Sequence, residues 1–425
     1  MIKIATIFFI ILPFQFALEP TPTVDLALIR IAAVCIFLFW LARGFFQKKI
    51  FLPKPTQLFF FLAFFLWELF SITWADNKEW SLRKGLFLCS FLPLLFVFVS
   101  LLREKKQERI LFEAFSFGAF LAACLALVQF FLQFFFGVET LFAFWIKNVT
   151  PFFLGQGFGA AVATYPSLLV NIGGETIFRA AGPFPDPHVA AFFFTMAFFV
   201  TLGLMNECPE EKRKKFFWWA GILLFADILT FSRGGYGGLF VGAIVFFVLF
   251  LITTMQIRKT IFFGIVSCCV FSFLFFLSPA GTRFLSSFSP DDTSNSERVR
   301  LWREAGVFFF EHPVLGTGLG NYPLAVKPTA TYREPIYVHN LYLDIIVETG
   351  FVGVALFAGL FLVVARVIWK RWLYEKNMLY LGVLTALFSF ATHSFFETVL
   401  FSVHVLPVFL LLLSVGMTKH FKYES

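Results

Sequence analysis

The sequence predicts an all-α, polytopic integral membrane protein with about 12 transmembrane helices and two long outer loops. Two observations carry this prediction. Hydrophobic residues make up 59% of the 425 positions and charged residues only 14%, with a mean hydropathy of +0.83, whereas a soluble domain carries about 25% charged residues. Apolar runs of roughly the length needed to cross a bilayer also recur along the chain, and short basic loops separate them.

Each predicted span is an apolar run that is long enough, or nearly so, to cross the hydrocarbon core. The first run also resembles a signal-peptide core behind Lys3, but the following Ala17-Leu18-Glu19-Pro20 is a poor cleavage site, so we expect a retained helix. We expect a single transmembrane domain over residues 1–425. The predicted spans are 4–18, 24–45, 57–74, 84–102, 110–136, 188–205, 215–232, 235–255, 260–279, 341–368, 378–395 and 397–416.

The Lys and Arg residues of the short loops orient these spans. With the N-terminus inside, the basic stretches at 48–54, 103–109 and 212–215 all lie in cytoplasmic loops, and an outside N-terminus inverts the bias. Both termini are therefore expected in the cytoplasm, and the long connections 137–187 and 280–340 face outward. Loops of this length within a compact domain are usually functional.

Composition also excludes several classes of function. The net charge of +8 is dispersed over short loops, whereas nucleic-acid binding needs a clustered basic face. The 69 phenylalanines are expected to fill lipid-facing and helix-packing surface. Of the six cysteines all but Cys208 fall in apolar runs, and no metal-ligand spacing or disulfide framework is present.

Several arginines lie in or beside the outer connections, on the side of the membrane that the loop bias disfavours: Arg179, Arg233, Arg283, Arg298, Arg300, Arg303 and Arg333. Arg233 occupies a minimal turn, Phe231-Ser232-Arg233-Gly234-Gly235, between two apolar runs. It either snorkels at a helix end or grips phosphate oxygens with its guanidinium fork. Arg179 precedes a Gly- and Pro-rich turn, where it either holds the turn by bonding carbonyls or contributes to the same anion site.

A third arginine, Arg298, follows Ser294-Asn295-Ser296-Glu297, whose Ser-x-x-Glu spacing predicts the start of a helix. In that helix Trp302 is expected at headgroup depth. Asp291-Asp292 resembles a metal-binding pair, but acidic charge at the start of the same helix is the better interpretation. Gly316-x-Gly318-x-Gly320 is a weak phosphate loop, because no strand–turn–helix pattern surrounds it.

The dipeptide His339-Asn340 stands where the second long connection enters a helix, and Gly350-x-x-Gly353 follows it after nine residues. A lone histidine at such a position is usually interfacial. Beside arginines that can hold an anion, it can instead take a proton, and neighbouring positive charge favours the neutral imidazole that a base requires. Asp344 and Glu348, further along this helix, either orient the site or line a cavity.

Together these stretches resemble the O-antigen ligase and polymerase family, membrane glycosyltransferases of bacterial envelopes. The similarity covers about residues 175–360 and departs from the family at His188, where an Asn is expected, so no role is carried over to that position. The matching stretches are Arg179 in Arg-x-x-Gly-Pro-Phe, Ser232-Arg233-Gly234, Arg298-x-x-x-Trp302 with the following His312-Pro313-Val314-Leu315-Gly316-Thr317-Gly318, and, as the most specific, His339-Asn340 with Gly350-x-x-Gly353.

The resemblance implies a substrate and a reaction. The donor is a glycan on undecaprenyl pyrophosphate at the outer face of the bacterial inner membrane, and in the ligase branch the acceptor is the lipid A–core oligosaccharide. The acceptor hydroxyl attacks with inversion, and no metal or other cofactor is expected because arginines neutralise the leaving group. The implied residues are His339 as the base, Arg179, Arg233 and Arg298 for pyrophosphate, and Asn340, Gly350, Gly353 and Trp302 as motif or structural residues.

Other functions remain open at this point. A polysaccharide polymerase or a protein O-oligosaccharyltransferase uses the same donor, and the sequence does not separate these from a ligase. A transporter of lipid-linked glycans places its binding groups near the midplane on broken helices, often within inverted repeats. No repeat is visible, and Glu68 and Asp227 are among the few acidic groups expected at that depth.

Overall fold

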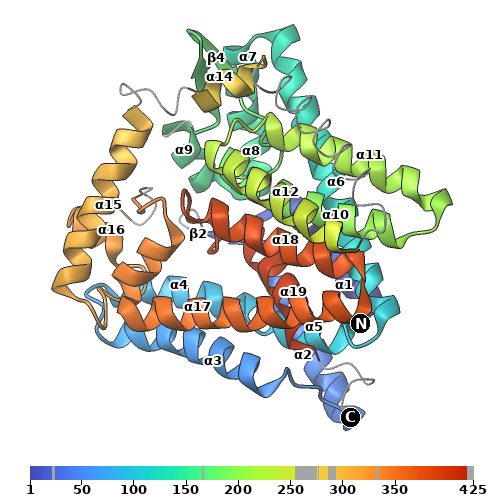
Figure 1. Cartoon of the computed structure of the whole chain (residues 1–425). Helices are drawn as coiled ribbons and strands as arrows, with labels where there is room; N and C mark the ends of the chain where they lie inside the picture. The colour runs from blue at the N-terminus through green and yellow to red at the C-terminus, as the bar shows by residue number, and fades with distance from the viewer. Residues whose placement is uncertain are drawn as a thin grey trace. The chain divides into compact units, whose positions relative to one another are not determined.

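The computed structural model (Figure 1) describes residues 1–21, 24–164, 167–253, 275, 277–285, 293–331, 334 and 336–418. Within these ranges the chain is helical except for turns and two short β-hairpins, so the prediction of an all-α, polytopic membrane protein is confirmed. The described helices that are long and apolar enough to cross a membrane are Leu28–Phe46, Pro55–Thr73, Lys78–Leu101, Lys105–Phe136, Pro187–Glu207, Arg233–Ile252 and Leu341–Glu375.

The predicted spans agree with the helices over most of their length where the structure describes the chain, with two corrections. The end of the span 4–18 and the start of the span 24–45 fall in an antiparallel hairpin formed by Ala17–Thr21 and Val24–Ala27, not in helices. The span 260–279 lies mostly outside the described residues, so the count of about 12 stays a prediction. The span 397–416 was wrong at its start, because the helix begins only at Val405 and residues 394–404 form a turning segment. This segment carries Glu397, a carboxylate that an uninterrupted membrane helix would leave in hydrocarbon.

The chain folds as two compact units, each built from separate stretches of sequence. The first comprises Met1–Ala114, Ser296–Ile368 and Ser394–Ser425. Its elements are α1 (Ile2–Ile11), η1 (Leu12–Phe14), β1 (Ala17–Thr21), β2 (Val24–Ala27), α2 (Leu28–Phe46), α3 (Pro55–Phe70), η2 (Ser71–Thr73), α4 (Lys78–Phe91), α5 (Leu94–Leu101), the start of α6 (Lys105–Phe136), most of α15 (Thr293–Glu311), α16 (Tyr322–Val326), most of α17 (Leu341–Glu375) and α19 (Val405–Met417).

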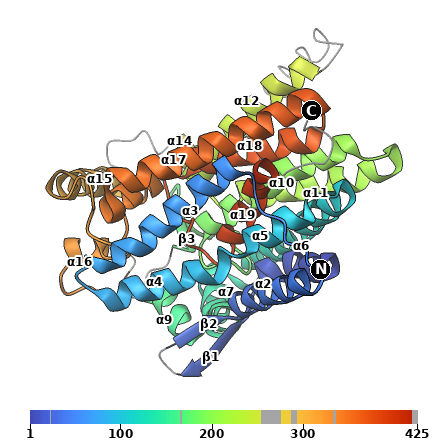
Figure 2. The same cartoon turned by 90° about the horizontal axis from the view of Figure 1, so that it is seen from below.

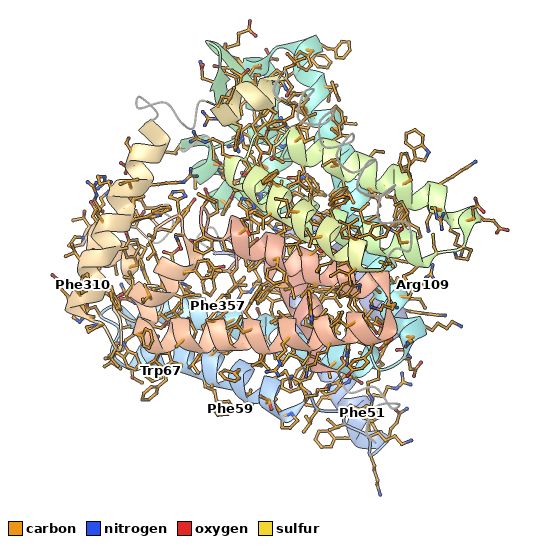
Figure 3. All side chains as sticks on the ribbon, viewed as in Figure 1. Phe51, Phe59, Trp67, Arg109, Phe310 and Phe357 are labelled. Atoms are coloured by element: carbon orange, nitrogen blue, oxygen red, sulfur yellow. The ribbon has the colours of Figure 1, made fainter. Side chains whose placement is uncertain are left out.

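In the first unit α3 and α4 run alongside α17 in both views (Figures 1 and 2). The seam between α3 and α17 is aromatic. Phe64 of α3 lies 5.3 Å, between ring centroids, from Phe357 of α17, which is labelled in Figure 3. Gly359 of α17 faces the ring of Phe60 so closely that a Cβ at this position would collide with it. The close approach fixes how α3 and α17 pack against each other.

The second unit comprises Phe115–Asn295 and Trp369–His393. In it α10 packs against both α11 and α18, and α12 packs against α18. Its elements are the rest of α6, α7 (Val138–Phe144), η3 (Trp145–Val149), α8 (Thr150–Leu154), α9 (Gln156–Thr164), β3 (Leu169–Ile172), β4 (Glu175–Phe178), α10 (Pro187–Glu207), α11 (Glu210–Ile228), α12 (Arg233–Thr253), α14 (Pro279–Leu285) and α18 (Met378–His393).

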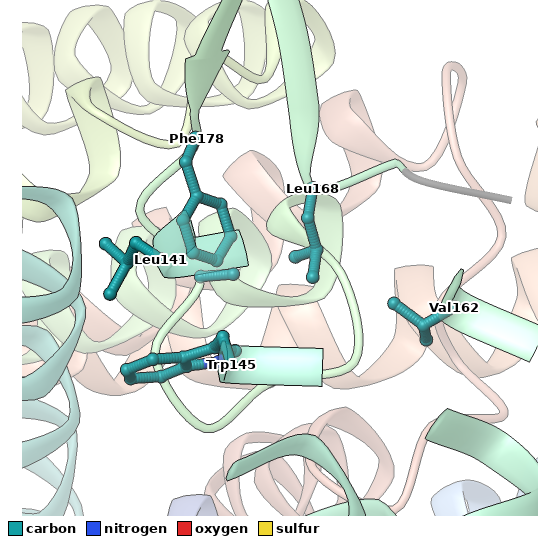
Figure 4. Packing of buried hydrophobic residues seen from close by; sticks show 6 residues of the cluster. Leu141, Trp145, Val162, Leu168 and Phe178 are labelled. Carbon is teal, nitrogen blue, oxygen red and sulfur yellow. The ribbon is translucent and has the colours of Figure 1, made fainter. Parts of the chain in front are cut away.

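The described parts of both long connections contain helices. The segment 137–187 contains short helices and the antiparallel hairpin β3–β4. Trp145, Leu168 and Phe178 of this segment are buried in one hydrophobic cluster (Figure 4). The segment 280–340 holds α14, α15 and α16, and α15 begins at Thr293, beside the predicted Ser-x-x-Glu start. Asp291-Asp292 lie outside the described residues.

Candidate active site

His339 lies in a polar cluster of the first unit. Its Nδ1 atom is 3.0 Å from Oε2 of Glu397, and Nη2 of Arg298 donates to Oε1 of the same carboxylate at 2.9 Å. The Glu397 side chain is only 3% exposed, whereas that of His339 is 28% exposed. The ring of Tyr337 covers the imidazole, with centroids 4.3 Å apart. The histidine is therefore held on one side and accessible on another.

The backbone presents His339 at the tip of a tight turn. Its φ angle is 54°, in the left-handed region that a non-glycine residue rarely adopts. Asn340 follows as the N-cap of α17, because its Oδ1 accepts hydrogen bonds from the backbone N–H groups of Tyr342 and Leu343. Asn340 thus starts the helix that follows the strained turn at His339.

Asp344 joins the two segments that carry His339 and Glu397. One carboxylate oxygen accepts a hydrogen bond from the backbone N–H of Val338 at 3.0 Å, and the other accepts one from the hydroxyl of Thr398. The side chain is 4% exposed. A single buried carboxylate therefore bonds the residue before His339 and the residue after Glu397, which fixes the two side chains relative to each other.

The charge next to His339 differs from the expectation. Burial lowers the pKa of the imidazole, but the Glu397 carboxylate and its hydrogen bond outweigh burial, and the net pKa lies above its ordinary value. Arg298 acts in the opposite direction and Asp344 in the same direction as Glu397. The surroundings expected from sequence were positive; instead the direct partner is a carboxylate, because Glu397 comes from residues 394–404, which were wrongly predicted to be helical.

The Gly350-x-x-Gly353 motif, which follows His339, packs against Pro313 and Val314, which precede His339. Helix α17 is broken at Gly350, whose φ is 68°, and a Cβ there would overlap the carbonyl oxygen of Val314. The N–H of Phe351 donates to the carbonyl of Pro313 at 2.9 Å. At Gly353, a Cβ would overlap the hydroxyl of Thr349. Hence both glycines are required by close contact.

The break in α17 is sealed by neighbouring groups. The last carbonyls of its first half, at residues 347–349, accept hydrogen bonds from the N–H groups of Thr317 and Gly318 and from Nε1 of Trp67, each at 2.8 Å. The glycine run 316–320 therefore serves as a capping loop for this half-helix. The amides of Thr317 and Gly318 thus bind helix carbonyls and not a phosphate. In the sequence, the pattern matched a phosphate loop only weakly.

Arg298 and Trp302 lie on α15, one turn apart. Trp302 packs against the buried Tyr322, Val338 and Ala305, so it supports the turn that leads to His339. The outer end of α15 is strongly exposed, with Phe310 80% accessible (Figure 3).

Arg179 in the second unit holds a turn. Its Nε donates to the carbonyl of Thr230 at 2.6 Å and its Nη1 to that of Ser167 at 3.0 Å, and the residue is 6% exposed. Two buried glutamines of α6, Gln129 and Gln133, hydrogen-bond the backbone of residues 178–182. The arginine thereby ties this turn to the connection that contains Arg233.

Arg233 is the first residue of α12 and follows Phe231, whose φ of 50° makes a sharp turn. The Oγ of Ser232 accepts from the N–H of Gly235 at 3.2 Å, and it lies 2.9 Å from Nδ1 of His188. Thus, in the second unit, Arg179 and His188 contact Thr230 and Ser232, in the turn that leads to Arg233. The sequence assigned no role to His188.

The structure places the predicted residues in two groups. His339, Asn340, Arg298, Trp302, Gly350 and Gly353 belong to the first unit, and Arg179 and Arg233 to the second. The most informative residue missed from sequence is Glu397. A signal for it was present, since Phe395-Phe396-Glu397-Thr398 sets a single carboxylate in an apolar stretch, and such groups are usually functional.

Two comparisons bear on the family. A family model described as "O-Antigen ligase" matches residues 218–358, which include Arg233, Arg298 and His339 but not Arg179. The chain is also 22% identical over 404 residues to the teichuronic acid biosynthesis protein TuaE of Bacillus subtilis (strain 168), covering 86% of this chain and 73% of that protein. The resemblance to the O-antigen ligase and polymerase family is thereby confirmed.

Proposed function

We propose that this multi-pass membrane protein, an O-antigen ligase-like enzyme of polysaccharide assembly, transfers a glycan from undecaprenyl pyrophosphate to an acceptor hydroxyl. The acceptor oxygen attacks the anomeric carbon of the donor with inversion, the bond from that carbon to the pyrophosphate oxygen breaks, and undecaprenyl pyrophosphate leaves. The observation that carries the proposal is the pair formed by Glu397 and His339, of which His339 lies inside the region matched by the family model.

His339 acts as the general base. With Nδ1–H donating to Glu397, Nε2 presents a lone pair and accepts the proton of the acceptor hydroxyl. The carboxylate raises the pKa of the imidazole, which makes the base stronger, and it stabilises the imidazolium formed by proton transfer. Buried Glu397 and the Tyr337 ring together restrict the imidazole to one orientation.

Arginines bind the pyrophosphate. We assign Arg233 as the principal contact, because it opens α12, whose N-terminal amides and dipole favour an anion. Arg179 contributes by holding the turn beside it and by its own charge. Arg298, already paired with Glu397, is assigned to pyrophosphate by the family resemblance alone. No metal is required by this scheme, because guanidinium groups neutralise the charge on the leaving group.

The acceptor we propose is a glycan hydroxyl, with lipid A–core as the ligase case. The relative TuaE is named for the biosynthesis of teichuronic acid, which supports an acceptor other than lipid A–core and keeps polymerisation of repeat units as the second candidate. Transfer to protein uses the same donor chemistry. The reaction takes place at the outer face of the bacterial inner membrane, with both termini in the cytoplasm.

A transporter of lipid-linked glycans is less well supported. The helix break at Gly350 resembles the discontinuous helices of transporters. In those proteins, however, freed carbonyls coordinate a substrate or an ion, whereas here the carbonyls of residues 347–349 are occupied by Thr317, Gly318 and Trp67.

The experiment that tests the proposed function is a gel of envelope glycans from a strain that lacks the protein. Polymer that accumulates on its lipid carrier indicates a ligase, and single repeat units indicate a polymerase. Glycan transfer that continues unchanged in the deletion strain contradicts both assignments.

A further inference from the structure

Three ionisable side chains meet between membrane-spanning helices of the first unit. Nζ of Lys84, on α4, lies 2.5 Å from Oε2 of Glu348, on α17, with the two side chains 19% and 7% exposed. Glu68 of α3 is 1% exposed and is an electrostatic neighbour of both. Among the described residues neither oxygen of Glu68 has a hydrogen-bond partner. Charged groups at membrane depth are costly and are usually kept for function.

Lys84 contacts two segments at once. We call residues 338–349 the His339 arm and residues 394–404 the Glu397 arm. The ammonium binds Glu348 of the His339 arm and also lies over the ring of Phe401 of the Glu397 arm, 4.0 Å from its centroid. A cation in this position stabilises both contacts simultaneously.

The His339 arm is a short lever. Its helical part, residues 341–349, is about 13 Å long, and it is capped by Asn340 at one end and by the break at Gly350 at the other. Asn340, Asp344 and Glu348 are spaced by four residues, so they share one face of this half-helix. A tilt of the half-helix at Glu348 therefore moves Asp344 and the turn that bears His339.

We propose that Lys84 is a positioning residue for His339: by binding Glu348 and Phe401 together, it fixes the His339 arm against the Glu397 arm at the end opposite to Asp344. The proposal rests on the proposed function only in assigning His339 as the base. Asp344 joins the two arms next to His339, and Lys84 joins them farther along. The N–H of Leu341 also donates to the carbonyl of Ser394, and the rings of Tyr342 and Phe395 are in contact, both near His339. Of these attachments, Lys84 lies farthest along the half-helix, so it restrains the end that the others do not hold.

The test replaces Lys84 by Met, which keeps the length of the side chain and removes its charge. We expect kcat for glycan transfer to fall by about 10- to 100-fold, the range that a displacement of about 1 Å produces, while the affinity for the donor stays unchanged. Lys84→Arg retains the positive charge and should recover most of kcat. Arg83→Met is the matched control, because Arg83 is on the same helix and pairs with Glu79 on the exposed surface.

A second readout does not depend on activity. The pKa of His339 responds to the groups around it, which are Glu397, Arg298 and Asp344, with Glu297 an electrostatic neighbour. If Lys84 holds the arms together, its loss separates His339 from Glu397 and lowers the pKa. Nuclear magnetic resonance of histidine-labelled protein, with His339→Ala for assignment, measures this pKa directly. The full-length protein in detergent or nanodiscs is used throughout.

The outcomes are separable. A lower pKa of His339 in Lys84→Met, with Arg83→Met unchanged, supports the positioning role even if no glycan transfer is detected and the proposed function fails. An unchanged pKa, or a kcat in Lys84→Met within twofold of the wild type, overturns it. If Lys84→Met does not accumulate, Glu348→Gln removes the same ion pair and must lower the pKa of His339 in the same way; an unchanged pKa there also overturns the proposal.

Discussion

Nδ1 of His339 lies 3.0 Å from Oε2 of Glu397, although 58 residues separate them in the sequence. This pair joins a strained turn before α17 to the turning segment before α19. In the proposed mechanism it combines the base with the carboxylate that orients it, and Arg298 binds the other oxygen of that carboxylate. The proposed chemistry of the first unit therefore depends on contacts between three separate segments of the chain, which carry His339, Glu397 and Arg298.

Replacement of Glu397 by Gln should lower kcat by at least about tenfold, because the imidazole loses the partner that sets its tautomer. The pH profile should change as well. A base must be unprotonated, so activity rises with pH through the pKa of His339, which Glu397 raises above its ordinary value. Without the carboxylate, burial and Arg298 still lower the pKa. The midpoint of the acidic limb of kcat should therefore move to lower pH, and a midpoint that moves upward contradicts the pairing.

Gly350→Ala should destabilise the protein. The φ of 68° is strained for any side chain, by about 1–3 kcal/mol, and the new Cβ overlaps the carbonyl oxygen of Val314. Gly306→Ala on α15 is the control, since a Cβ there meets nothing within 4 Å, and alanine in a helix is favoured by up to about 1 kcal/mol. Thermal unfolding in detergent should show a lower midpoint for Gly350→Ala only. Equal midpoints for the two variants speak against the packed glycine motif.

The outward orientation of residues 280–338 can be tested by labelling with an impermeant thiol reagent. In a background without native cysteines, Ser296→Cys should react from outside the cell when the outer membrane, if present, is permeabilised, and Lys212→Cys should not. Both positions are exposed in the structure. Native Cys208 is only 6% exposed, so a failure of the reagent to label it would reflect its burial as well as the side of the membrane on which it lies. Reaction of Lys212→Cys from outside reverses the proposed orientation.

Hydropathy and loop charge predicted most of the helices, because a membrane-spanning helix requires a continuous run of apolar residues, which is visible in the local sequence. They could not predict that residues 394–404 turn back, since Phe395, Phe396 and Phe401 are as apolar as a membrane helix and only Glu397 interrupts them. The glycine motifs were recognisable, yet their reason is a contact between Gly350 and Val314 that only the folded chain shows. Long-range pairs such as Lys84 with Glu348 leave no local pattern.

Arg233→Lys should lose most glycan transfer while the protein still inserts and accumulates normally. An ammonium keeps the charge but lacks the guanidinium fork that binds two phosphate oxygens. The assay uses purified protein and lipid-linked donor, with accumulation measured on the same preparation. Transfer near the wild-type rate by Arg233→Lys contradicts the anion-binding role and indicates that Arg233 only snorkels at a helix end. In the same assay EDTA should have little effect, and a strict requirement for Mg²⁺ contradicts the metal-free scheme.

The role of His339 is tested most directly by single-turnover transfer with His339→Ala. General-base catalysis contributes about 10²–10⁴-fold in rate, so we expect transfer to slow by that factor while donor affinity, measured separately, changes little. His312→Ala is the control, because His312 is exposed. His393 is not a suitable control, because it is 1% exposed and stacked on Phe192, so its loss also disturbs packing. Transfer by His339→Ala at the wild-type rate, or a defect explained entirely by lost donor binding, contradicts the assignment of His339 as the base.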